Sequence, residues 1–316
     1  MSPTLVQTTA DLSYVLPGTT FYEFDSERVG ARFGVWVTLP LLYDQEERDY
    51  PLVFQPDGNK AAPTTAPPAA LLRDDPINPI KPFIQVSVGY VGEDARRLLA
   101  IRARDLLPPG EPLSSEVDES MLDNLPRAGM LSRADARLYL DHLRDPHADR
   151  FLAFLTEELD PALRSQFRVS DSGTGLHGFS YGGLFASYAA LSTDHFEMVG
   201  AGSPGILHNS TVLDLYDQAV ADESRPTARH LHVTVCEREL TYPSTYQDLV
   251  GRGAVDLVRR AGQNPVQGMD VTAAFTPTES HATGSAASWF SFLRECYAAD
   301  SPTSTLARVH PSGESQ

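Results

Sequence analysis

The sequence predicts an α/β fold with a mostly parallel central sheet and helices on both of its faces. Short, β-rich apolar segments alternate with helical segments along the chain, which is typical of this class. The segments read as nearly continuous apolar runs, as expected of strands buried on both faces. The 316 residues are 41% hydrophobic and 21% charged, an ordinary globular composition that can bury a large core. We expect one domain over residues 1–300.

The expected strands are bounded by turn residues and are rich in β-branched and aromatic side chains. In chain order they span residues 33–40, 51–55, 83–90, 176–179, 196–202 and 230–236. The later helices follow from apolar periodicity between these strands. They span residues 149–165, 183–191, 211–221, 245–260 and 283–298.

Three segments interrupt this alternation. Residues 61–70 are a low-complexity stretch with three prolines, and because proline breaks regular helices we expect a loop there. Residues 108–146 form a long, acidic, turn-rich insertion with a short helix expected over 134–143. An insertion of this length is either a lid over a functional site or a surface excursion. Residues 301–316 are small and polar and predict a disordered tail.

The charge balance excludes several classes of partner. Lys and Arg number 25 and Asp and Glu number 42, for a net charge of −17, so we expect neither nucleic acid nor an anionic membrane as a partner. Two cysteines are too few for a disulfide framework or a cysteine-based metal site. Residues 1–14 lack the regions of a signal peptide, and no apolar run could span a bilayer. We therefore expect a cytoplasmic protein.

The chemistry-bearing motif is Gly178-Phe-Ser-Tyr-Gly182. It matches the G-x-S-x-G nucleophile elbow, which needs a strand before it and a helix after it. Both are predicted here, so Ser180 is the candidate nucleophile at the N-terminus of a helix whose dipole favours developing negative charge. Ser203 is a rival after another strand, but Pro204 follows it and has no N–H for an oxyanion. We interpret Ser203 as a structural or pocket-lining residue.

An activated serine needs a general base and an acid that orients the base. In this fold the order is Ser, then Asp or Glu, then His. His281 is favoured as the base, because the other late histidine, His310, lies in the expected tail. Glu237 and Glu239 both follow the strand that ends at Cys236, and the residues alone leave these two open. No His, Asp and Glu spacing predicts a metal site, and the chemistry needs no cofactor.

The oxyanion requires two donors. One is the backbone N–H of Tyr181, directly after the nucleophile. The second is expected in the loop Gln55-Pro-Asp-Gly-Asn59, where Gly58 allows a close backbone approach.

Five segments carry a resemblance to a known family. They lie in order along the chain at residues 50–59, 102–108, 149–159, 178–184 and 236–239. Together they resemble the putative-esterase (esterase-D-like) family of α/β-hydrolases. Residues 50–59 are similar to its D-G-N segment, residues 102–108 to its R-x-R-D-x-T-P signature, and Cys236-Glu-Arg-Glu239 to its G-x-x-E acid segment.

The resemblance implies an α/β-hydrolase fold, selects Glu239 over Glu237, and makes Asn59 the second oxyanion donor. It also implies that Gly58, Tyr90, Arg104 and Ser203 border the substrate. The chain departs from the family pattern at Leu107, at Cys236 and after Ser203, where a second serine and an aromatic residue are missing. Such positions usually border the pocket, so they bear on the identity of the substrate.

Within the family the siderophore-esterase branch looks nearest, because of the D-G-N segment and the acid site. The net charge of −17 and the lack of an Arg/Lys cluster in the sequence around the elbow count against a polyanionic substrate. The sequence thus predicts a serine esterase that acts on a small ester, lactone or thioester, such as a siderophore or other secondary metabolite. The alternatives are an acyltransferase, cyclase or thioesterase with the same triad, or a non-catalytic binding module on a hydrolase fold.

Overall fold

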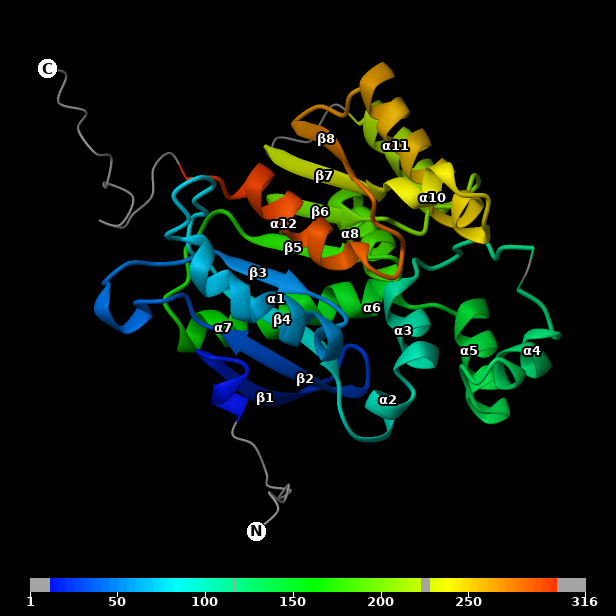
Figure 1. The fold of residues 1–316 in the computed structure, drawn as a ribbon, viewed down its shortest axis with the longest axis horizontal. Coiled ribbons are helices and arrows are strands. Elements are labelled where there is room, and N and C mark those ends of the chain that lie inside the picture. Colours follow the sequence, from blue (N-terminus) through cyan, green and yellow to red (C-terminus); the bar gives the residue numbers. More distant parts are fainter. Residues whose placement is uncertain (1–11, 116, 223–227, 300–316) are drawn as a thin grey trace, which may run out of the picture.

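The computed structural model describes residues 12–115, 117–222 and 228–299 (Figure 1). These residues form an eight-stranded sheet in the order β1-β2-β4-β3-β5-β6-β7-β8. The strands are β1 (Thr19–Ser26), β2 (Ala31–Thr38), β3 (Leu52–Gln55), β4 (Ile84–Tyr90), β5 (Gly175–Phe179), β6 (Met198–Gly202), β7 (Arg229–Cys236) and β8 (Met269–Thr276). The β1–β2 and β2–β4 pairs are antiparallel, and every pair from β4 to β8 is parallel.

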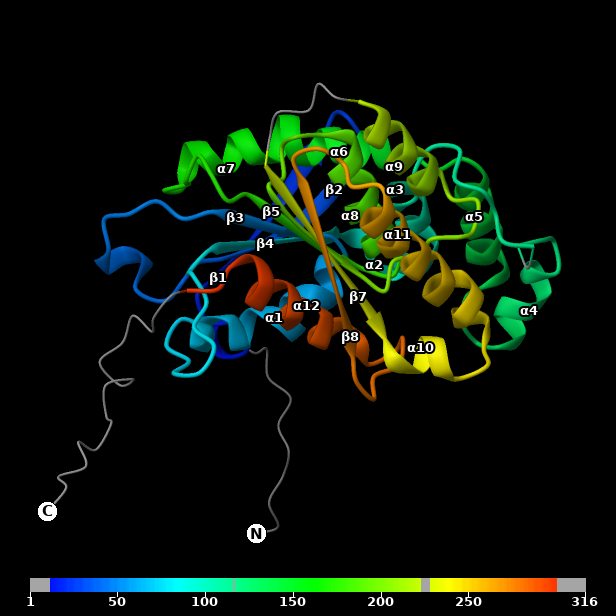
Figure 2. The same ribbon diagram turned by 90° about the horizontal axis from the view of Figure 1, so that it is seen from above.

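Helices cover both faces of this sheet, as the sequence predicts. They are α1 (Gly58–Leu72), α2 (Gly92–Arg96), α3 (Leu98–Leu106), α4 (Met121–Arg127), α5 (Arg133–Arg144), α6 (Ala148–Ala153), α7 (Asp160–Gln166), α8 (Tyr181–Ser192), α9 (Thr211–Ala221), α10 (Glu237–Thr241), α11 (Arg252–Gln263) and α12 (Gly284–Cys296). Figure 2 shows α1 and α12 on one face and α6, α7, α8, α9 and α11 on the other. Because the strands from β4 to β8 are parallel, their carboxyl ends meet at one edge of the sheet, where such folds place their sites.

The inner strands are continuous apolar runs because both of their faces are covered. All residues of β3 and β4 are buried. The two outer strands differ: most residues of β1 and most residues of β8 are at least partly exposed, and neither contains an apolar run. For this reason the sequence does not reveal them.

The prediction of a loop at residues 61–70 is wrong. This stretch lies inside helix α1, which contains Pro63, Pro67 and Pro68. Proline removes a backbone hydrogen bond wherever it stands in a helix interior. Packing compensates here, because Ala62 and Ala66 are buried against the rest of the fold. Thr65 is also buried, and its hydroxyl donates to Gln55 Oε1 (2.9 Å).

The insertion at 108–146 contains α4 and α5, with α5 where a short helix is expected. Figure 1 shows this pair at the right, apart from the body of the sheet. Leu122, Ala136 and Leu140 form a small core of its own, and the Ser132 hydroxyl caps α5 by accepting from Asp135 N–H (3.1 Å). The tail expected at 301–316 lies outside the described residues. Among the helices that the structure describes, none is long and apolar enough to cross a membrane.

Candidate active site

The turn between β5 and α8 holds Ser180 in a strained conformation. Its φ is 63° and its ψ is −120°, a region that residues with a side chain rarely adopt. The Ser180 N–H donates to Gly202 O (2.9 Å), which ties the turn to the next strand. A Cβ on Gly178 would lie 2.0 Å from Gly182 O, so the turn can close only with glycine there. The strained serine thus projects from the tip of the elbow.

Three side chains from distant parts of the chain form one hydrogen-bonded series at this elbow. His281, in the loop between β8 and α12, has its Nε2 2.8 Å from Ser180 Oγ. Its Nδ1 lies 2.7 Å from Glu239 Oε1, in the first turn of α10. Since a carboxylate only accepts, Nδ1 carries the ring hydrogen and Nε2 is left to accept from the serine hydroxyl.

The Glu239 carboxylate is buried, and the fold satisfies its second oxygen too. Oε2 accepts from Cys236 N–H (3.0 Å) and from the Ser203 hydroxyl (2.8 Å). Glu237 instead accepts from Thr278 N–H (2.6 Å). The structure therefore brings Glu239, and not Glu237, to the histidine. Three hydrogen-bonding groups around one carboxylate fix its orientation.

Ser203 has a different place from the one expected. The prediction that it borders the substrate is wrong, because its side chain is fully buried behind the triad and donates to Glu239. The Ser203 hydroxyl orients Glu239, which in turn orients His281. Because the Ser203 side chain is buried, it cannot contact a substrate.

Two aromatic rings border His281, and the sequence reasoning missed both. The Tyr246 ring stacks on the imidazole with centroids 4.2 Å apart and an interplanar angle of 17°. The Phe179 ring lies 5.1 Å away at 42°. Tyr246 belongs to a segment without a motif, so no spacing in the sequence could have marked it.

The start of α1 lies beside the elbow. A Cβ on Gly182 would come within 3.5 Å of Asp57 Oδ2. Tyr181 and Asn59 stand in the first turns of α8 and α1, where backbone N–H groups have no acceptor within their own helix. Two helix N-termini, each with a favourable dipole for an anion, therefore meet next to Ser180.

Gly58 and Tyr90 act on Asn59 through the backbone. A Cβ on Gly58 would lie 2.7 Å from Val88 C, so only glycine lets α1 start against β4. The Asn59 side chain then pairs with the Tyr90 backbone: its Nδ2 donates to Tyr90 O (2.9 Å), and its Oδ1 accepts from Tyr90 N–H (2.7 Å). The Tyr90 side chain itself is nearly buried, and burial raises the pKa of its phenol.

The arginines of α3 have unequal contacts. Arg104, the predicted substrate contact, pairs with its neighbour Asp105 (2.7 and 2.8 Å). Arg102, which the sequence reasoning did not select, pairs with Asp57 and lies over the Tyr181 ring. Burial lowers the pKa of Arg102, but the Asp57 carboxylate raises it by more, so this guanidinium stays charged. The sequence signal for it was the R-x-R-D signature itself.

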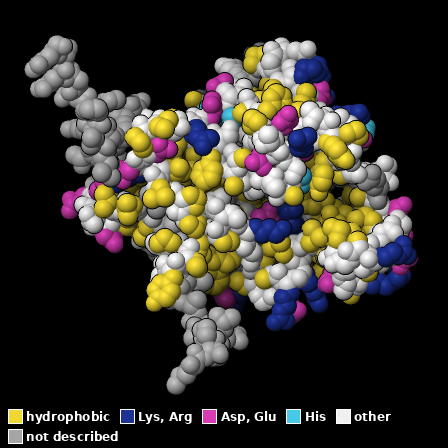
Figure 3. Space-filling view, viewed as in Figure 1, with side chains coloured by type: hydrophobic (Ala, Val, Ile, Leu, Met, Phe, Trp, Pro, Cys, Tyr) yellow, Lys and Arg dark blue, Asp and Glu magenta, His cyan; other side chains and the backbone are white. Residues whose placement is uncertain are grey.

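The surface is hollowed between the α4–α5 insertion and the rest of the molecule (Figure 3). Hydrophobic side chains gather along the insertion, next to basic and acidic ones. The insertion reaches the elbow through Tyr139 of α5, whose hydroxyl lies 2.7 Å from that of Tyr181. Burial raises the pKa of both phenols, so both remain neutral.

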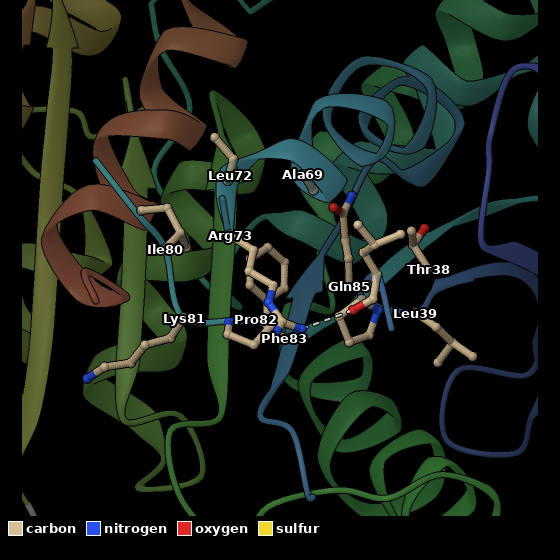
Figure 4. A pocket seen from close by; sticks show the side chains of 12 residues that line it. Thr38, Leu39, Ala69, Leu72, Arg73, Ile80, Lys81, Pro82, Phe83 and Gln85 are labelled. Atoms are coloured by element: carbon tan, nitrogen blue, oxygen red, sulfur yellow. Dashed lines mark hydrogen bonds between the residues drawn. The ribbon is translucent and has the colours of Figure 1, made fainter. Parts of the chain in front are cut away.

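Other hollows lie away from this site. The cavity in Figure 4 has a volume of about 20 Å³, room for about one water molecule, and is lined by residues from 38–41, 69–73 and 80–85. A larger one of about 330 Å³ is lined by residues such as Tyr50 and Met198, at the amino ends of the parallel strands. Neither contains a triad residue.

One group among the described residues has the composition of a metal site. Ligand atoms of His230, His232 and Glu295 lie within 4.8 Å of one another. The histidine nitrogens already have hydroxyl partners, with Thr272 Oγ1 2.8 Å from both rings and Ser291 Oγ 2.9 Å from His232 Nε2. The group is distant in the fold from Ser180, and it is explained by these hydrogen bonds.

Comparisons with known proteins bear on this geometry. Residues 111–240 match the model of a family described as putative esterase. The matched stretch includes Ser180 and Glu239. The predicted resemblance to this family is confirmed.

One curated protein resembles this chain in sequence, and several solved structures resemble it in fold. The ferri-bacillibactin esterase BesA of Bacillus subtilis (strain 168) is 24% identical over 199 residues, which is 62% of this chain and 62% of that protein. The BES protein from Bacillus cereus superposes with a TM-score of 0.69 at 20% identity, covering 92% of this chain and 98% of that one. The siderophore hydrolase EstA from Aspergillus nidulans gives 0.69 at 19%, covering 92% and 99%. These structures confirm the predicted α/β-hydrolase fold.

Proposed function

We propose that this protein is a serine esterase that works through an acyl-enzyme on Ser180. The observation that carries the proposal is the hydrogen-bonded series from Ser180 through His281 to Glu239, placed on a strained strand-to-helix turn. Each member has the geometry that its role requires. The binding-module alternative gives no reason for the strain or for the buried carboxylate.

The reaction follows from these contacts. His281 Nε2 takes the hydroxyl proton as Ser180 Oγ bonds to the ester carbonyl carbon, and Glu239 stabilises the imidazolium. The carbonyl oxygen becomes an oxyanion, which accepts hydrogen bonds from the backbone N–H groups of Tyr181 and Asn59. Each such donor lowers the barrier by about 3 kcal/mol.

The intermediate then collapses. The bond to the alcohol oxygen breaks, and the imidazolium protonates the leaving alcohol. Water next attacks the acyl-enzyme, its proton passes to His281, and the acid leaves as Ser180 regains its own proton. An alcohol or amine in place of water would give acyl transfer instead, the main alternative, which needs a site that excludes water.

The substrate we propose is an ester or lactone of a siderophore or a similar secondary metabolite. BesA is named a ferri-bacillibactin esterase and EstA a siderophore hydrolase, and both resemble this chain. The sequence around the elbow lacks an arginine cluster, and Arg102, which α3 brings to the Tyr181 ring, is already paired with Asp57. The net charge of −17 still favours a substrate with little negative charge.

The test is turnover of p-nitrophenyl esters, an aryl lactone and a thioester by the wild type and by Ser180→Ala. We expect the wild type to hydrolyse at least one class and the variant to lose at least about 10³-fold in kcat, with unchanged circular dichroism. Added alcohols separate hydrolysis from acyl transfer by the products formed. Equal turnover by the two proteins would refute the assignment of Ser180.

A further inference from the structure

The two proposed oxyanion donors come from segments far apart in the sequence, and one side chain contacts both segments. We propose that Arg102 is a positioning residue that holds the N–H groups of Asn59 and Tyr181 at the spacing an oxyanion needs. This rests on the proposed esterase function. Arg102 acts through Asp57 on one side and through the Tyr181 ring on the other.

The first contact fixes the start of α1. Arg102 Nε donates to Asp57 Oδ1 (2.8 Å) and Nη2 to Oδ2 (2.6 Å), a two-pronged pair of defined geometry. Asp57 has a φ of 58°, a left-handed conformation that is unfavourable for a residue with a Cβ. Its carbonyl accepts from Lys60 N–H (2.8 Å) and Ala61 N–H (2.9 Å), so the conformation of Asp57 sets the turn that contains Asn59.

The second contact fixes the residue after the nucleophile. The Arg102 guanidinium lies over the Tyr181 ring, 5.1 Å from its centroid, a cation–π distance. The far end of that ring is held by the Tyr139 hydroxyl at 2.7 Å. With its ring fixed at two points, Tyr181 can hardly rotate its backbone N–H away from Ser180.

Burial strengthens the ion pair between Arg102 and Asp57. The side chains of Arg102 and Asp57 are 10% and 15% exposed, so water screens their attraction little. Lysine could not replace the fork, since an ammonium group does not bind both carboxylate oxygens in one plane. Arg104 on the same helix is committed to Asp105 and does not substitute for Arg102.

A positioning role has a kinetic signature. Misplaced donors weaken binding of the oxyanion and leave binding of the neutral ester nearly unchanged, so kcat falls while KM stays. A trifluoromethyl ketone, which adds to the serine as an anionic hemiketal, should lose affinity by the same factor as kcat/KM. A purely structural role would instead lower only the apparent kcat, in proportion to the fraction of folded protein, and would leave the KM and the ketone affinity unchanged.

The experiment compares wild type, Arg102→Met, Arg102→Lys and Asp57→Asn with one p-nitrophenyl ester and one trifluoromethyl ketone. We expect kcat to fall by at least about tenfold in each variant, by analogy with losses of about 10²–10³ for a deleted donor. KM should stay within about threefold, and the ketone should weaken in proportion to kcat/KM. The Arg102→Met/Asp57→Asn double variant should be no worse than Arg102→Met.

Arg164→Met is the matched control, because it breaks another arginine–aspartate pair, that with Asp160, on α7 away from the elbow. It should keep kcat and ketone affinity. If Arg102→Met fails to fold, the more conservative Arg102→Lys and Asp57→Asn decide by the same criteria. Folded variants with wild-type kcat, or with a lower kcat but unchanged ketone affinity, would overturn the role of Arg102. A wild type that turns over no ester would instead refute the proposed function.

Discussion

At the scale of single residues, the acid of the proposed triad is defined by what surrounds it. Glu239 Oε1 faces His281 Nδ1, while Oε2 accepts from Cys236 N–H and from the Ser203 hydroxyl. The two oxygens therefore have different duties. One orients the histidine, and the other anchors the carboxylate to β7 and to the loop after β6.

The Glu239→Gln variant tests this division. Two donors face the Oε2 position, so the amide oxygen should turn there and the NH₂ group should face His281. That arrangement forces the ring hydrogen onto Nε2, the wrong tautomer, and we expect kcat to fall by about 10⁴-fold with the fold retained. Ester turnover and thermal melting measure the two effects. The Glu237→Gln variant, at a half-buried position that does not contact the histidine, is the control, and a similar loss in both would show that Glu239 has no special part.

At the scale of elements, the elbow depends on close contact between β5 and α8. A Cβ on Gly178 would lie 2.0 Å from Gly182 O, and backbone cannot move aside as a flexible side chain can. We expect Gly178→Ala to lower the melting temperature and to abolish turnover. Gly262→Ala in α11 is the matched control, because nothing lies within 4 Å of its added methyl. It should be stabilising by up to about 1 kcal/mol, measured by urea denaturation.

The insertion is fastened to α9 by a second buried carboxyl group. Glu111 Oε2 accepts from Thr211 N–H (3.1 Å) at the start of that helix, while Oε1 has no hydrogen-bond partner among the described residues. Burial raises the pKa of Glu111 from 4.5 to about 7. The folded state therefore binds more protons than the unfolded state between about pH 4.5 and 7, and this group lowers stability as the pH rises through that window.

Replacing the carboxyl group should remove that pH dependence. We expect Glu111→Gln to match the wild type at pH 4.5–5 and to exceed it at pH 8 by on the order of 1–3 kcal/mol in unfolding free energy. Urea denaturation at the two pH values measures the difference. Glu93→Gln, at an exposed position of α2, is the control. A constant gap between Glu111→Gln and wild type at both pH values would contradict this account of the buried carboxyl.

At the scale of the whole molecule, the sequence predicts the buried inner strands of the sheet and misses the partly exposed strands at its edges. The six inner strands are apolar runs, and all six lie close to where the sequence predicts them. β1 and β8 border the sheet and have mixed faces, so no pattern marks them. Helix α1 forms although proline usually breaks a helix, because the packing of Ala62 and Ala66 outweighs the lost backbone hydrogen bonds.

Some residues of the candidate site could likewise be predicted from the sequence, and others could not. Ser180 and His281 follow from a local motif and from chain order, and the family resemblance adds Glu239 and Asn59. The contacts of Arg102, Tyr139 and Tyr246 join residues at least 35 positions apart in the sequence. Only the folded chain brings such groups together, and the family resemblance therefore pointed to Arg104 instead of Arg102.

The central claim is that Ser180 is an activated nucleophile. The most direct measurement is the intact mass of the wild type and of Ser180→Ala after brief exposure to a fluorophosphonate, which phosphonylates only an activated serine. The account predicts one adduct on the wild type and none on the variant. An unlabelled wild type, or the same adduct on both proteins, would contradict it.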